Sequence, residues 1–191
     1  MTALGPFAWA VVSLYLLTAA ATLSAGSRVL DATGRIPGRK RRSEARPIWL
    51  AITIALVAGA ADRRFGLMSA GVYALREAAL IGGWYDVRRP LQASFIVAVI
   101  LLSPVSMLAL RAAAGRGGRP VAVAAVTTAA LAAFLLVRAT SLHGVDAVLR
   151  EQVLGFSLYT LPEVVALGIL ILAALAERQT VFRRVPRTAK A

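Results

Sequence analysis

Long apolar stretches alternate with short charged segments along the whole chain. Four stretches approach the roughly 20 residues that an α-helix needs to cross a bilayer, namely residues 4–23, 91–110, 120–137 and 161–176. Residues 48–61 form a shorter stretch, which a locally thinner bilayer and the long side chains of Arg63 and Arg64 can accommodate. The pattern predicts an all-α fold, a polytopic transmembrane helix bundle of about five spans that forms one integral membrane domain over residues 1–191.

Residues 65–81 interrupt this series of spans. Their apolar positions recur with helical periodicity, but Arg76 and Glu77 stand near the centre. Two charges at the middle of a bilayer are costly, so the sequence predicts an interfacial or re-entrant helix here. The next two residues are glycines, which end the helix, and the Trp84 and Tyr85 that follow are typical of the aromatic belt at a membrane surface.

Basic residues gather in three segments. Residues 27–47, residues 111–119 and the tail after residue 176 together hold 15 of the 22 Lys and Arg residues. Five spans place all three segments on one side, which the positive-inside rule assigns to the cytoplasm. We therefore predict an external N-terminus, a cytoplasmic C-terminus and a solvated basic loop at 27–47. A sixth span at 65–81 would put 111–119 on the side opposite to 27–47.

Composition supports a membrane location. Hydrophobic residues make up 59% of the chain and the mean hydropathy is +0.72, which is far more apolar than a soluble globular domain. A net charge of +13 would suggest nucleic acid as the partner of a soluble protein. Here the charge lies between apolar stretches, so we expect anionic lipid headgroups at the cytoplasmic basic loops and no nucleic acid. The abundance of Ala and Arg indicates a high-GC bacterial genome and predicts a bacterial inner (plasma) membrane.

The residue types present exclude several kinds of site. The chain has no cysteine, and therefore no disulfide, thiolate metal site, iron–sulfur cluster or cysteine nucleophile. One histidine, His143, cannot supply bis-histidine haem ligation, and no nucleotide-binding or zinc motif occurs. Ser141 and His143 are two residues apart on one predicted helix and face different directions, which disfavours a serine protease. We expect neither a metal nor a cofactor.

Charged residues accumulate on the predicted outer side. Six of the nine acidic residues, seven arginines and His143 fall there. The densest stretch begins at Arg138 and ends at Asp146, on a helix that we expect to continue from 120–137 to residue 149. On such a helix Arg138, His143 and Asp146 lie within a sector of about 140°. His143 and Asp146, three residues apart, are neighbours on the helix surface.

Two interpretations of this cluster stay open at the level of sequence. In the first, Arg138 and Asp146 form ion pairs with Glu163 or with the charged residues of 65–81, and these pairs hold helices together while His143 bridges by hydrogen bonds. In the second, Asp146 orients His143 as a general base and a pair of arginines binds an anionic group.

The candidate site residues extend beyond the cluster. The candidate catalytic residues are His143, Asp146 and Arg138. The candidate binding residues are side chains of the outer side that can bind an anion, a carboxylate or a ring: Arg76, Glu77, Trp84, Tyr85, Arg88, Arg89, Gln92, Ser141 and Glu163. Arg88 and Arg89 stand on the side where the positive-inside rule predicts few arginines, which favours a specific anionic partner for them.

Three sequence elements resemble an uncharacterised family of small polytopic bacterial inner-membrane proteins. They are Arg76-Glu77, the pattern Gly-Trp-Tyr-x-x-Arg-Arg-x-x-Gln of residues 83–92, and the pattern Arg-x-x-Ser-x-His-x-x-Asp of residues 138–146. The resemblance carries over no activity, cofactor or substrate. The third element also looks like part of the lipid phosphatase signature, but both of its spacings are one residue short and the Ser-Gly-His element is missing.

These observations favour a non-enzymatic integral membrane protein. We expect its outer polar cluster to bind a partner subunit, which can be a second copy of the chain, or an anionic lipid or solute. The alternative is a small membrane enzyme that acts on a lipid-borne phosphate or carbonyl group, with His143 as base and arginines as charge stabilisers. A second alternative is proton-coupled transport, with Asp146, His143 and Glu163 as the relay.

Overall fold

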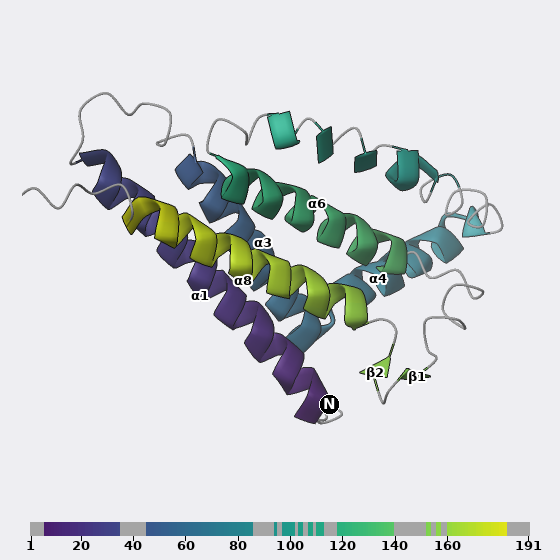
Figure 1. The fold of residues 1–191 in the computed structure, drawn as a ribbon. Helices are drawn as coiled ribbons and strands as arrows, with labels where there is room; N and C mark the ends of the chain where they lie inside the picture. Colours follow the sequence, from purple (N-terminus) through teal and green to yellow (C-terminus); the bar gives the residue numbers. More distant parts are fainter. Residues whose placement is uncertain are drawn as a thin grey trace, which may run out of the picture.

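The chain folds into a bundle of long helices. The computed structural model describes residues 6–34, 45–85, 118–139 and 160–182, together with residues 94, 97–101, 103–104, 107–108, 110–112, 152–153 and 156–157. The helices are α1 (Pro6–Gly34), α3 (Ala45–Phe65), α4 (Leu67–Ile81), α6 (Arg119–Ala139) and α8 (Leu161–Phe182). Two strands of two residues each, β1 (Gln152–Val153) and β2 (Phe156–Ser157), pair antiparallel before α8 (Figure 1).

Four helices form the body of the bundle. α1 packs against α3 on one side and α8 on the other, and α8 also packs against α6. Figure 1 shows that α1 and α8 run in one direction, whereas α3 and α6 run in the opposite direction. The ends of α3 and α6 therefore lie near the starts of α1 and α8, which brings residues that are far apart in the sequence to one end of the bundle.

Three of the described helices are long and apolar enough to cross a membrane. These segments are Trp9–Ser27, Ala45–Phe65 and Arg119–Arg138. Large apolar side chains such as Leu17, Ile54 and Leu172 point outward and are largely exposed. Exposed apolar surface on this scale is typical of a protein that has lipid around it. The helical fold is therefore compatible with a membrane protein.

The helices are longer than the apolar stretches that predicted them. α3 has 21 residues where the sequence indicated 48–61, and it spans about 31 Å, enough for a bilayer core. α8 continues beyond residue 176 to Phe182, and α1 continues to Gly34, so the start of the predicted loop 27–47 is helical. The residues that extend α8 include Glu177, Arg178 and Gln179, which are good helix formers, so the helix continues beyond its apolar stretch.

Two further predictions can be compared with the structure only in part. α6 ends at Ala139 in its described part, and the predicted extension to residue 149 lies outside the described residues. Most of the predicted span 91–110 also lies outside them, apart from short helical pieces.

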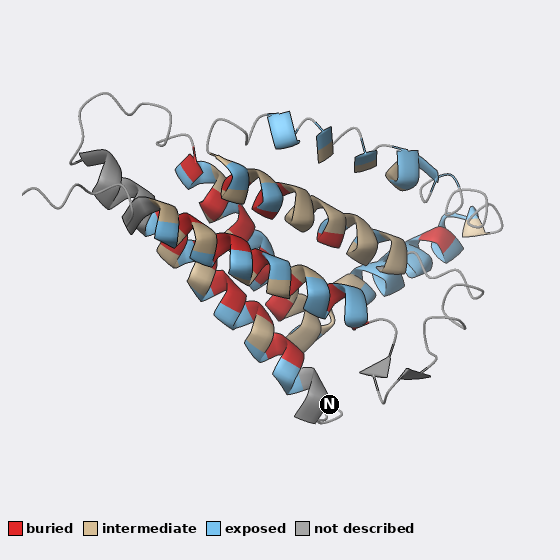
Figure 2. Cartoon of the chain, in the orientation of Figure 1, coloured by how far each residue is buried: buried red, intermediate tan, exposed pale blue. Residues whose placement is uncertain are grey.

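The core is made by the facing sides of α1, α3, α6 and α8. Figure 2 shows the buried residues on these inner faces. Tyr15 and Trp49 are the largest fully buried side chains. Small residues let the helices approach: a Cβ on Gly26 would lie 3.1 Å from the Cβ of Trp49. A hydrogen bond of 2.9 Å between the hydroxyls of Thr22 and Thr53 adds a polar link between α1 and α3. Close contacts between small and hydroxylated residues are the usual means of packing helices in lipid.

α4 leaves the bundle at a sharp break. Gly66 separates it from α3 with φ of 66°, a left-handed conformation that glycine adopts without strain. The side chain of Asp62 then accepts a hydrogen bond of 2.6 Å from the backbone N–H of Met68 and so caps the new helix. Almost every residue of α4 is exposed except Ala79, and Ile81 is 88% exposed.

Candidate functional site

A buried carboxylate joins four helices at one end of the bundle. Glu163 stands in the first turn of α8 and its side chain is 0% exposed. An isolated charge in such a position is very costly, so its partners decide what the group can do.

Each oxygen of the Glu163 carboxylate accepts two hydrogen bonds. Arg63 of α3 binds the carboxylate through two nitrogens, with Nε 3.0 Å from Oε2 and Nη2 bonded to Oε1. Nη1 of Arg138, in α6, donates to the same Oε1 at 2.7 Å. The hydroxyl of Tyr15, in α1, donates to Oε2 at 3.3 Å. We refer to Tyr15, Arg63, Arg138 and Glu163 as the Glu163 cluster.

The helix ends favour this distribution of charge. Arg63 and Arg138 lie in the last turns of α3 and α6, where the carbonyl ends of the helices carry partial negative charge. Glu163 lies in the first turn of α8, at the end with partial positive charge. Because α3 and α6 run against α8, these three turns meet (Figure 1). The local sequence therefore positions each charge, and the antiparallel packing brings the charges together.

Tyr15 reaches the cluster because α3 has a glycine opposite its ring. A Cβ on Gly59 would lie only 2.7 Å from Cε1 of Tyr15, closer than side chains tolerate. The absent side chain leaves room for the ring, which is 1% exposed, and lets the hydroxyl point at Glu163.

The cluster has the geometry of a structural tie. A bidentate contact from one arginine, a bond from a second and a hydroxyl donor occupy the lone pairs of the carboxylate. The side chains of Arg63 and Arg138 are 21% and 31% exposed, so both arginines are only partly buried. This arrangement holds four helices in register, and it leaves Glu163 poorly placed to pass a proton to a neighbour.

Aromatic rings hold two further arginines. The guanidinium of Arg64 lies 5.4 Å from the ring centre of Trp9 and 5.3 Å from that of Phe65. The guanidinium of Arg76 lies 5.8 Å from the ring centre of Tyr85. Cation–π contacts of this kind orient an arginine without neutralising its charge. The described part of the chain contains the ion pairs Arg63–Glu163 and Arg138–Glu163. Neither Arg64 nor Arg76 takes part in them.

The structure brings two of the predicted site residues into contact and leaves others apart. Arg138 and Glu163 form an ion pair. Arg76 and Glu77 lie exposed on α4, and no ion pair joins either of them to Arg138 or Glu163. Trp84 and Tyr85 follow the end of α4. The remaining candidates lie outside the described residues: Arg88, Arg89, Gln92, Ser141, His143 and Asp146.

Sequence reasoning missed Tyr15 and Arg63 as members of the site. Arg63 was interpreted as a side chain that helps the short stretch 48–61 span the bilayer and as one of several outer arginines, and its partner is 100 residues away. Tyr15 was counted within an apolar stretch. The available signal was its position on one helical face with Thr18 and Thr22, since three hydrogen-bonding side chains in line on a membrane helix indicate a face packed against protein.

Comparisons with known proteins do not add an assignment. No family model, curated protein or solved structure matches the chain. Among the described residues, no group of three or more His, Cys, Asp or Glu side chains could hold a metal ion. The geometry of the Glu163 cluster is therefore the feature from which a function can be inferred.

Proposed function

We propose that the protein is a non-enzymatic, multi-pass protein of a bacterial inner membrane whose extracytoplasmic face binds an acidic group of a partner subunit. It has about five spans, with α4 at the outer surface, the N-terminus outside and the C-terminus in the cytoplasm. In this topology the Glu163 cluster lies at the outer end of the bundle and fixes the frame on which the partner is bound.

This proposal depends mainly on one observation, that hydrogen-bond donors occupy both oxygens of the Glu163 carboxylate. An acid–base catalyst or a relay carboxylate has to exchange a proton with its surroundings, and a carboxylate that accepts four hydrogen bonds from three helices is held against such exchange. A structural tie needs that saturation, because an uncompensated charge inside a membrane bundle destabilises it. Glu163 therefore supports a scaffold more strongly than proton-coupled transport, whose relay would include it. It also pairs with Arg138, which the enzyme alternative would need as a charge stabiliser.

Arg64 and Arg76 supply the binding side of the proposal. Both are oriented by aromatic rings; Arg64 is partly exposed at the end of α3, and Arg76 is exposed on α4. An arginine held by a ring is preorganised to form a bidentate contact with a carboxylate. The acidic group of a partner is thus the chemistry that fits this face.

Photo-crosslinking in membranes tests the binding. A photoreactive residue at Tyr73, which is exposed on α4, is expected to give one protein adduct of defined mass. Arg76→Gln should remove the adduct, since it deletes the anion contact, while Arg111→Gln on the opposite side should keep it. Adducts with lipid alone, or an adduct that survives Arg76→Gln, would contradict a partner held by arginine.

A second comparison separates the scaffold from an enzyme. His143→Ala should leave both the growth phenotype and the melting temperature unchanged if the protein is a scaffold. Loss of the phenotype at an unchanged melting temperature would instead favour catalysis with His143 as base.

A further inference from the structure

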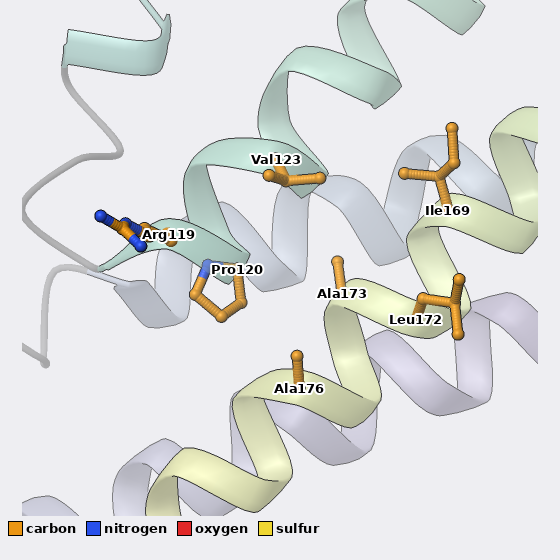
Figure 3. A pocket seen from close by; sticks show the side chains of 7 residues that line it. All are labelled: Arg119, Pro120, Val123, Ile169, Leu172, Ala173 and Ala176. Atoms are coloured by element: carbon orange, nitrogen blue, oxygen red, sulfur yellow. The ribbon is translucent and has the colours of Figure 1, made fainter.

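An apolar groove runs between α6 and α8, away from the Glu163 cluster. Figure 3 shows its walls: Pro120 and Val123 come from α6, and Ile169 and Ala173 come from α8. The groove has a volume of about 300 Å³ and is open to the surroundings of the bundle. Among the described residues that line the groove, Arg119, at the start of α6, is the charged one.

We propose that this groove binds one acyl chain of an anionic phospholipid, with the lipid phosphate at Arg119. The inference rests on the multi-pass topology of the proposed function and adds a second site at the opposite end of the bundle. In that topology Arg119 marks the cytoplasmic ends of the helices, where lipids with anionic headgroups are enriched.

The length of the groove matches part of an acyl chain. Along α8 the lining extends from Ile169 to Ala176, a rise of about 10 Å. One leaflet contributes about half of a hydrocarbon core of roughly 30 Å. The groove can therefore hold about two-thirds of the depth of one acyl chain.

The charge at the mouth selects the lipid. Arg119 is exposed and lies at the end of the groove near Ala176, away from Ile169 (Figure 3). An acyl chain in the groove thus places its phosphate beside the guanidinium, which binds phosphate oxygens bidentately. In the proposed topology the basic segments 111–119 and 177–190 are also cytoplasmic and add to the attraction of an anionic headgroup. A zwitterionic lipid lacks the net charge that this end favours.

Photoreactive phospholipids test the site on the full chain in lipid nanodiscs. Phosphatidylglycerol with a diazirine on one acyl chain is expected to label Val123, Ile169 or Leu172, and the matched phosphatidylcholine should label them less. Arg119→Gln should reduce labelling by phosphatidylglycerol about fivefold, the factor for about 1 kcal/mol from one basic residue at an anionic surface. Arg111→Gln, in the same basic segment but outside the groove, is the matched control.

A second variant fills the groove. Ala176→Leu should block labelling of the groove by both lipids, whereas Ala132→Leu, at an exposed position of α6 outside it, should not. Equal labelling by both lipids that Arg119→Gln does not change would overturn the proposal. So would a crosslink from the groove to a second protein chain.

A reporter fusion distinguishes an error in the proposed topology from an error in the proposed lipid site. A C-terminal reporter that reads external would overturn the proposed sidedness. Unselective labelling with a cytoplasmic reporter would overturn the lipid site alone.

Discussion

Replacing Glu163 by glutamine removes the carboxylate that holds Arg63 and Arg138 while keeping the size of the side chain. The glutamine amide can still accept through its oxygen, but its nitrogen is a donor and would face the donors of an arginine or of Tyr15. Removing one partner of a buried ion pair costs about 3–5 kcal/mol. Because the two arginine side chains are 21% and 31% exposed, water can solvate them in part. We therefore expect a loss near the lower limit, about 3 kcal/mol.

Thermal unfolding of the detergent-solubilised protein measures this loss. For a chain of this length, about 3 kcal/mol corresponds to a decrease in melting temperature of roughly 6–12 °C. The matched control is Glu77→Gln, because Glu77 is exposed on α4, and its effect should stay within about 0.5 kcal/mol. If the melting temperatures of the two variants are equal, the Glu163 cluster does not stabilise the bundle.

A double-mutant cycle identifies the interaction responsible. Arg63→Gln should cost less in the Glu163→Gln background than in the wild-type protein, with a coupling of about 0.5–3 kcal/mol for groups in direct contact. Additive effects of the two substitutions would show that the ion pair is not the source of the stability.

Three further predictions follow from the geometry. Tyr15→Phe should cost only about 1 kcal/mol or less in unfolding free energy, because its bond to Glu163 is long at 3.3 Å, and a loss of 3 kcal/mol would contradict this. Gly59→Ala should lower stability by about 1–3 kcal/mol because the new methyl group meets the ring of Tyr15, whereas Gly168→Ala, which has open space, should be neutral or stabilising in the same melting assay. A reporter after Ala191 should read cytoplasmic and one before Thr2 external, and a cytoplasmic reading at both ends would restore residues 65–81 as a span.

The sequence alone predicted the helical class and most of the helices. Apolar stretches near the length of a bilayer core, and breakers such as the glycines after Ile81, are local properties that each segment carries by itself. The predicted helix ends were less accurate, because α1 continues to Gly34 and α8 continues through Glu177, Arg178 and Gln179, which are good helix formers. Local hydrophobicity identifies a helix, whereas its ends depend on capping and packing.

The members of the Glu163 cluster were decided by the tertiary structure. The sequence placed Glu163 and Arg138 among the outer charges, since the number and sidedness of charges can be counted along a chain. One of the two open interpretations paired Arg138 with Glu163, but the sequence could not identify the other partners, because Arg63 lies 100 residues away and Tyr15 lies 148 residues away. Those pairings depend on the antiparallel packing of α3 and α6 against α8 and on the space that Gly59 leaves for a ring. Contacts between distant segments form only when the helices pack, and that geometry is a property of the folded bundle.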